Sequence, residues 1–157
     1  MKLPPRLRFV WPVLAYGLVY PSTMFAADVP TGSTMRVYFG SYTGARSKGI
    51  YVSRFNSSTG ALTAPELAVA TASPSFLTLH PNRRFLYAAG ETSILNGKRV
   101  GAVAAFSVNA TTGKLTLLNR QSSGGEGPCH LAVDKTGKCL LVANYDDGTI
   151  EIGRAHV

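Results

Sequence analysis

The chain has 157 residues, of which 45% are hydrophobic and 15% charged, with sixteen glycines and nine prolines. This balance is typical of a compact, turn-rich domain and excludes a disordered tail. The net charge of +8 comes from basic residues that lie singly or in pairs without interleaved aromatic residues, so we expect no nucleic-acid partner.

Residues 1–27 have the order of a secretory signal peptide. Basic residues come first, an uncharged stretch runs over residues 9–25, and small residues follow at Ala26 and Ala27. We therefore predict a periplasmic or secreted protein with no stable membrane insertion after signal cleavage. An uncleaved N-terminal anchor, or a buried strand in a cytoplasmic protein, is the alternative.

The rest of the chain predicts strands and no helix, because short runs of β-branched, aromatic and alternating apolar residues are separated by turn signals. In chain order the expected strands are residues 36–42, 49–56, 61–70, 76–80, 84–90, 101–108, 114–121, 129–134 and 139–145.

Two segments of this part recur at a nearly constant spacing. Residues 56–63 recur as 109–116, and residues 74–91 recur as 128–145. A period of roughly 50 residues with four strands is that of a propeller blade. We therefore predict an all-β fold for residues 28–150, a β-propeller of four-stranded antiparallel blades of which about two to two and a half are present. A β-sandwich is the alternative, but it does not predict this repetition.

Residues 151–157 are expected to be a non-native tail. Residues 152–157 can be encoded by a nucleotide string that resembles a sequencing-library adapter. On this interpretation the third blade loses its continuation after Gly148.

The cysteines flank a predicted tight hairpin centred near Thr136 and Gly137. This hairpin pairs Cys139 with Asp134 and separates Cys139 from Cys129 by about 16 Å, at about 3.3 Å per residue. That distance is too long for a disulfide. We expect buried free thiols and, without neighbouring histidine or carboxylate ligands, no metal site.

Collinear motifs over residues 37–150 carry a family resemblance. They are YFGSYT, KGIYV, STGAL, LYAAGE, GPCHLAVD, GKCLLVANY and DDGTI. Together they resemble the lactonase-type seven-bladed propellers, which include bacterial 6-phosphogluconolactonases. The resemblance implies hydrolysis of a sugar lactone, a small-molecule substrate, with no cofactor. Gly90 stands where the family usually has asparagine, and Ser41 where threonine is commoner.

Six polar residues are expected to meet at one mouth of the propeller channel. In a propeller the loops from second to third strands, and from an outer strand to the next inner strand, share one face, and such a concave opening is the default ligand site. Near these loops lie Tyr42, Thr43, Glu91, His130, Asn144 and Tyr145.

We predict His130 and Glu91 as catalytic residues. An imidazole moves protons near neutral pH, and Glu91 would orient it or bind sugar hydroxyls. Hydrogen bonds to the substrate are expected from Tyr42, Thr43, Asn144 and Tyr145. A purely structural role is an equal alternative for Glu91 and Asn144. His80 is expected to be a turn residue at the opposite face.

Basic residues follow the same rim. Arg46 and Lys48 lie in one expected loop and Lys98 and Arg99 in the next, an arrangement suited to attract a phosphate or carboxylate. Lys98 and Arg99 are therefore predicted to bind substrate, and simple solvation of loop charges is the alternative.

Two functions follow from these features. The first is a metal-independent sugar lactonase, for which export favours an unphosphorylated aldonolactone. The second is a non-catalytic exported propeller that binds a ligand or a protein partner, since fold alone does not separate the two.

Overall fold

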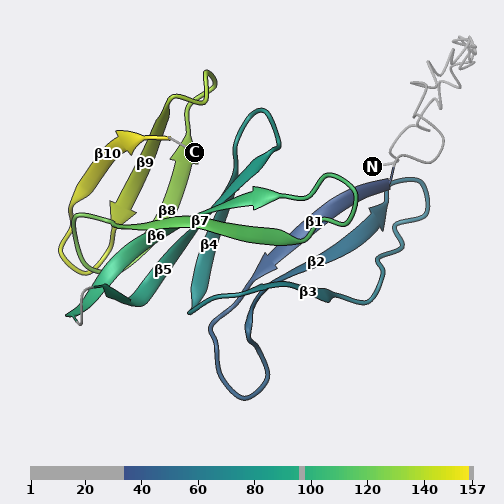
Figure 1. Ribbon diagram of the computed structural model, residues 1–157, viewed down its shortest axis with the longest axis horizontal. Coiled ribbons are helices and arrows are strands. Elements are labelled where there is room, and N and C mark those ends of the chain that lie inside the picture. Colours follow the sequence, from purple (N-terminus) through teal and green to yellow (C-terminus); the bar gives the residue numbers. More distant parts are fainter. Residues whose placement is uncertain (1–33, 96–97, 156–157) are drawn as a thin grey trace, which may run out of the picture.

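The computed structural model describes residues 34–95 and 98–155, which form ten β-strands and no helix (Figure 1). The all-β prediction is therefore confirmed, while the predicted signal segment lies outside the described residues. Within these residues no helix is long and apolar enough to cross a membrane. The strands are β1 (Thr34–Gly40), β2 (Gly49–Asn56), β3 (Glu66–Ala70), β4 (Pro74–Leu79), β5 (Phe85–Leu95), β6 (Lys98–Val108), β7 (Leu115–Ser122), β8 (Pro128–Val133), β9 (Cys139–Asn144) and β10 (Ile150–Arg154).

The strands form three antiparallel sheets that follow one another along the chain (Figure 1). The first sheet has the order β1-β2-β3, the second β4-β5-β6-β7, and the third β10-β9-β8. The second sheet is a whole four-stranded blade. The first sheet matches its last three strands and the third sheet its first three, as the sequence repeat predicts. This arrangement confirms successive propeller blades.

The cores between the sheets depend on the two-residue alternation of side chains along β6. Ala104 and the fully buried Phe106, 0% exposed, pack against the first sheet, where they meet Ile50. Val103, the next residue toward the start of β6, faces the third sheet and meets Leu140. Each face of the second sheet is thus buried by a neighbouring blade.

The repeated asparagine–glycine motif forms the same turn in both copies. The side-chain oxygen of Asn56 accepts hydrogen bonds from the backbone N–H groups of residues 58 and 59, and that of Asn109 from those of residues 111 and 112. Gly60 and Gly113 have φ values of +70° and +78°, a region that L side chains rarely adopt. This geometry explains why the motif recurs.

The hairpin between the second and third strands of the middle blade is longer than predicted. β5 continues to Leu95 and β6 begins at Lys98, with Leu95 opposite Lys98 and Ile94 opposite Arg99. The expectation that Lys98 and Arg99 lie in a loop is therefore wrong, because the β-branched residues of this segment continue the strand pairing. In the first blade, the outer strand expected over residues 61–70 is shorter and begins at Glu66.

The third sheet continues where the sequence predicts a break. β10 pairs with β9 from Ile150 opposite Ala143 to Arg154 opposite Cys139. A third strand therefore forms after Gly148, because the backbone of residues 150–154 pairs with the free edge of β9; the loss of the natural continuation there stays a prediction. The non-native origin of residues 151–157 stays a prediction.

The predicted hairpin between the cysteines is confirmed, since the backbone N–H of Asp134 donates to the carbonyl of Cys139. Both cysteines are free and exposed, so the prediction of buried thiols is wrong. Cys139 begins a strand at the end of the sheet, and Cys129 lies in an irregularity of β8, where its side chain is not covered by another blade.

Candidate active site at one mouth of the channel

All six predicted mouth residues lie at the same end of the three sheets. We call this end the mouth and define it by the loops that meet there, which comprise residues 41–48, 71–73, 123–127 and 145–149. Residues 35–43 also match residues 84–92, so Tyr42, Glu91 and Tyr145 are equivalent positions that follow or extend the second strand of each blade.

Tyr42 and Glu91 join the first blade to the second. The Tyr42 hydroxyl donates to the Glu91 carboxylate and lies 2.9 Å from each of its two oxygens. The hydrogen bond and the negative charge of Glu91 raise the pKa of Tyr42, because both favour the neutral phenol. With 64% of its surface exposed, Tyr42 remains open to a ligand in the channel.

Thr43 is used to hold two mouth loops together. Its hydroxyl lies 3.3 Å from that of Ser73, and the backbone N–H of Ser73 donates to the Thr43 hydroxyl at 3.3 Å. Ser73 has a φ of +38°, a strained value for a residue with a side chain. No sequence motif marked Ser73, because its importance comes from a loop thirty residues away.

Asn144 is 3% exposed and ties together the loops on either side of it. Its side-chain nitrogen donates to the Ser123 carbonyl and to the Thr149 hydroxyl, both at 3.0 Å. Its side-chain oxygen has no hydrogen-bond partner among the described residues. Asn144 therefore shapes the mouth, and its predicted contact with substrate stays a prediction.

Asp147, which the sequence analysis did not predict as a site residue, also connects the 123–127 and 145–149 loops. Its carboxylate accepts the Thr149 hydroxyl at 2.8 Å and the backbone N–H of Glu126 at 2.9 Å. These hydrogen bonds, with that from Thr149 the largest, lower the pKa of Asp147. The sequence signal available was its place in an Asp-Asp-Gly turn.

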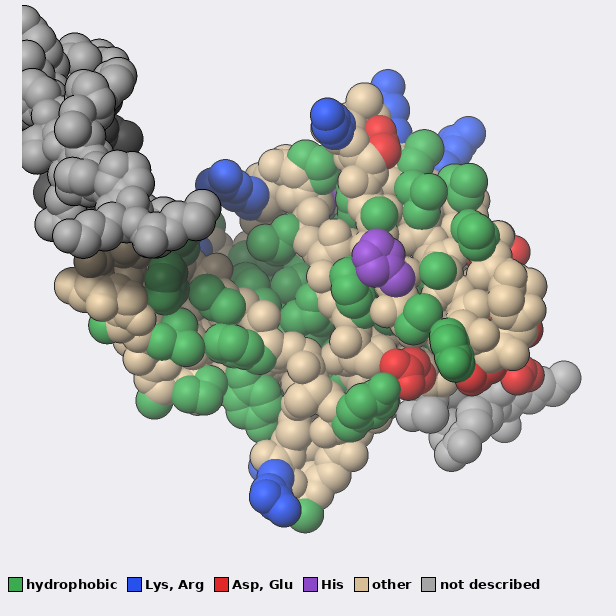
Figure 2. All heavy atoms as spheres, turned by 180° about the vertical axis from the view of Figure 1, so that it is seen from behind, with side chains coloured by type: hydrophobic (Ala, Val, Ile, Leu, Met, Phe, Trp, Pro, Cys, Tyr) green, Lys and Arg blue, Asp and Glu red, His purple; other side chains and the backbone are tan. Residues whose placement is uncertain are grey.

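Tyr145 and His130 present their side chains at the same mouth. Tyr145 is 80% exposed, and its backbone N–H donates to the Gly127 carbonyl at 2.8 Å. His130 is exposed on β8, and its ring centroid lies 4.3 Å from that of Phe76 on β4. Figure 2 shows acidic side chains gathered toward one edge of a face on which hydrophobic side chains are widespread.

The structure describes the side chains of two of the four basic residues predicted near the mouth. Arg46 and Lys48 are exposed in the 41–48 loop. The backbone of Lys98 and Arg99 belongs to β6, and their side chains lie outside the described part of the structure. Their predicted contact with substrate stays a prediction.

His80 lies at the opposite end of the sheets, as predicted for a turn residue. One ring nitrogen, Nε2, is 2.9 Å from the Gly137 carbonyl, and Nδ1 accepts the backbone N–H of Asn82 at 3.2 Å. Nε2 thus joins the second blade to the third, and Nδ1 holds the turn of the second blade itself.

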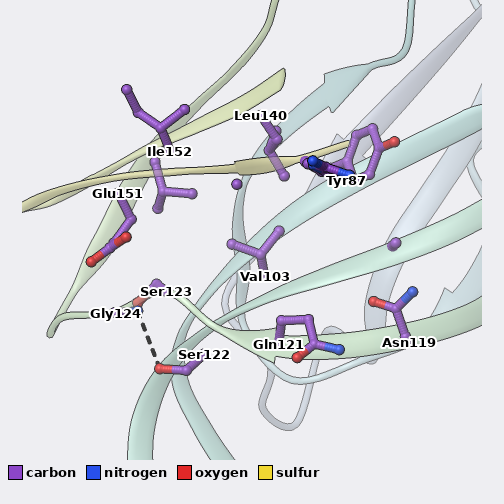
Figure 3. Close-up of a pocket in the computed structure, with 14 residues that line it drawn as sticks. Tyr87, Val103, Asn119, Gln121, Ser122, Ser123, Gly124, Leu140, Glu151 and Ile152 are labelled. Atoms are coloured by element: carbon purple, nitrogen blue, oxygen red, sulfur yellow. Dashed lines mark hydrogen bonds between the residues drawn. The ribbon is translucent and has the colours of Figure 1, made fainter. Parts of the chain in front are cut away.

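A cavity of about 550 Å³ lies between the second and third blades and reaches the mouth loop at Ser123 and Gly124 (Figure 3). Gly153 is one of the residues that line it. Leu140 faces Gly153, whereas at the same repeat position of the second blade Leu86 faces Phe106. Because glycine has no side chain to fill this position, we interpret the cavity as a packing gap and not as a substrate site.

The chain matches the family described as "Lactonase, 7-bladed beta-propeller" over residues 36–156. It is 35% identical over 115 residues to a 6-phosphogluconolactonase of Bacillus subtilis, covering 73% of this chain and 32% of that protein.

Two solved structures are also similar. One, from Bacteroides fragilis and bearing the name 6-phosphogluconolactonase, has a TM-score of 0.66 at 36% identity and covers 82% of this chain and 33% of that one. The other, a periplasmic gluconolactonase of Pseudomonas aeruginosa, has a TM-score of 0.68 at 27% identity. The match covers 76% of this chain and 34% of that one. The chain thus spans about a third of the length of these relatives. It belongs to the lactonase family of seven-bladed β-propellers.

Proposed function

We propose that this chain supplies one whole blade and three strands of each neighbouring blade of a seven-bladed enzyme that hydrolyses a sugar lactone. The proposal is supported by the position of His130, Glu91 and Tyr42 at the same end of the three sheets, in a chain that belongs to the lactonase family. The B. subtilis and P. aeruginosa relatives are named for lactones of this class.

In the proposed reaction, water attacks the carbonyl carbon of the lactone. His130 accepts a proton from that water as the carbon–oxygen bond forms. When the tetrahedral intermediate collapses, the bond from this carbon to the ring oxygen breaks, and the protonated imidazole returns its proton to the leaving oxygen. The product is the open-chain hydroxy acid.

Glu91 has a supporting role in this proposal. Its carboxylate accepts the Tyr42 hydroxyl, which fixes its position while leaving acceptor capacity for sugar hydroxyl groups. The exposed Tyr145 hydroxyl is suited to donate to the carbonyl oxygen as negative charge develops there. Thr43 and Asn144 act by holding the loops that carry these groups.

We further propose that the protein works in the periplasm on an unphosphorylated aldonolactone. This rests on the signal-like residues 1–27 and on the similarity to a periplasmic gluconolactonase. Sugar phosphates are cytoplasmic metabolites. The alternative is a phosphorylated lactone whose phosphate binds Lys98 and Arg99. In that case, reversal of both charges will raise KM for the phosphorylated lactone and leave KM for the neutral lactone unchanged.

The test is turnover of glucono-δ-lactone and its 6-phosphate by the seven-bladed protein, measured by pH-stat with spontaneous hydrolysis subtracted. His130→Gln should lower kcat by roughly 10²–10⁴-fold, the usual contribution of a general acid–base residue. His80→Gln at the opposite end is the matched control and should leave kcat unchanged. Equal turnover by the His130 variant and the native protein would remove His130 from the mechanism.

A non-catalytic exported propeller is the second candidate. The observation that favours it is that Thr43 and Asn144 use polar atoms to hold mouth loops rather than leaving them to a ligand. Tight binding of a lactone by the native protein without any turnover would support this candidate.

A further inference from the structure

Phe76 and His130 occupy the same position in two successive repeats, the third residue of an inner strand. Phe76 lies on β4 of the second blade and His130 on β8 of the third. Their ring centroids are 4.3 Å apart with an interplanar angle of 46°. Side chains on neighbouring inner strands therefore meet across the boundary between two blades.

A β-bulge precedes both rings. The pairing of β4 with β5 shifts register between Pro74 and Phe76, and that of β8 with β9 shifts between Pro128 and His130. A bulge bends its strand and changes the direction in which the following side chain points. The same irregularity thus aims both rings in the two copies of the repeat.

The two rings differ in how they are held. Phe76 is half-buried and packs against the core between the second and third blades. His130 is exposed, and no hydrogen bond from another described residue reaches either of its ring nitrogens. A histidine in a catalytic site is usually oriented by a hydrogen bond to one nitrogen. The contact that the structure shows for His130 is with the Phe76 ring.

We propose that Phe76 is a positioning residue that holds the His130 imidazole at the mouth by ring packing. This inference rests on the proposed function. Because no described residue forms a hydrogen bond with Nδ1 or Nε2, one nitrogen is available to accept a proton from water and the other to donate to substrate. A shift of about 1 Å in a catalytic group costs up to 10²-fold in rate, so loss of the Phe76 ring should lower kcat more than it raises KM.

The first test examines the contact without activity. In the seven-bladed protein with labelled histidine, the NMR signals of the His130 ring protons should carry a ring-current shift from Phe76. Phe76→Leu should remove that shift, and Phe76→Tyr should keep it. An unchanged His130 signal in Phe76→Leu would overturn the proposal.

The second test separates positioning from packing by kinetics. Phe85 is the matched control, because it is also half-buried against the same core and contacts a histidine, His80, at the opposite end, with ring centroids 5.8 Å apart. Phe76→Leu should lower kcat about tenfold with little change in KM. Phe76→Tyr, which keeps an aromatic ring, should have a kcat close to that of the native protein. Phe85→Leu should destabilise the protein to a similar extent without changing kcat.

The outcomes distinguish this inference from the proposed function. If His130→Gln abolishes turnover while Phe76→Leu does not change kcat, the positioning role is wrong and the lactonase proposal stands. If Phe85→Leu lowers kcat as much as Phe76→Leu, the effect is general packing and the positioning role is also wrong. If His130→Gln has no effect, the proposed function itself fails, whatever the NMR result.

Discussion

The Tyr42 hydroxyl lies 2.9 Å from both carboxylate oxygens of Glu91 and links the first blade to the second. The raised pKa of Tyr42 follows from this contact. Folding favours the neutral phenol, so the contribution of this contact to stability is present below the ordinary tyrosine pKa of about 10. It is lost as the pH rises through the raised value.

We therefore predict that Glu91→Gln lowers the pKa of Tyr42, because the negative charge beside the phenol is removed. NMR titration of tyrosines labelled at the ring carbon bonded to oxygen measures this change. Tyr38 and Tyr87 are internal controls, since burial is the largest cause of their raised pKa values. An unchanged Tyr42 titration would show that the contact does not persist in solution.

A second prediction concerns acid stability. Asp134 accepts the backbone N–H groups of Lys138 and Cys139 at 2.7 and 2.8 Å and also the hydroxyl of Thr136. These hydrogen bonds, led by that from Thr136, lower the pKa of Asp134 to about 2. Because the folded-state value lies below the unfolded one, the stabilisation is present above the ordinary aspartate pKa and is lost as the pH falls toward 2.

The difference in urea midpoint between the native chain and Asp134→Asn should therefore narrow as the pH is lowered from 5 to about 2. The difference should be modest, since the carboxylate is exposed to solvent. A difference that stays constant across this pH range would contradict the assignment.

A third prediction concerns the cavity between the second and third blades. A Cβ added at Gly153 meets nothing within 4 Å, so Gly153→Leu should fill the gap beside Leu140 and raise the free energy of unfolding. Full burial of a leucine contributes about 1.5–3 kcal/mol. Ile150→Val, at an exposed position of the same strand that does not line the cavity, is the control and should have a small effect. No stabilisation by leucine would contradict the packing-gap interpretation.

The same register makes a prediction about the natural sequence. At the equivalent position of the second blade stands the buried Phe106. If residues 151–157 are foreign, the natural residue opposite Leu140 should be large and apolar. Sequencing the gene beyond the codon for Thr149 checks this prediction. A natural glycine opposite Leu140 would contradict both the foreign origin of residues 151–157 and the packing-gap interpretation of the cavity.

A fourth prediction concerns association of this chain alone. Leu141, Ile150 and Ile152 are exposed on the outer face of the third sheet, where a following blade would pack. Such an apolar sheet face favours self-association. Sedimentation velocity should show concentration-dependent oligomers that Ile150→Lys and Ile152→Lys together reduce. A monodisperse native chain would contradict this prediction.

The sequence predicted the blades well because their information is local. Strand positions follow from alternating residues, and the Asn56 and Asn109 turns repeat because the same side-chain hydrogen bonds recur. The hairpin that continues to Leu95 and Lys98 does not follow from the sequence, because its polar first residues, 91–93, are typical of a loop. The exposed cysteines were missed because burial depends on neighbouring blades.

The side-chain contacts within the candidate site could not be predicted from the sequence, for a different reason. The contacts between Thr43 and Ser73 and between Phe76 and His130 join segments thirty or more residues apart. Residue type places each of these side chains near the mouth, but only the packing of one blade against the next decides which atoms meet. The use of Asn144 to hold loops is a further example.

The most direct measurement is a crystal structure of the seven-bladed protein with a non-hydrolysable aldonolactam in place of the lactone. The account predicts that this analogue lies at the mouth, with its carbonyl and ring heteroatom within hydrogen-bond distance of His130 or a bridging water and its hydroxyl groups near Glu91. An analogue bound at the opposite end, beside the turns that contain His80 and Gly137, would contradict it.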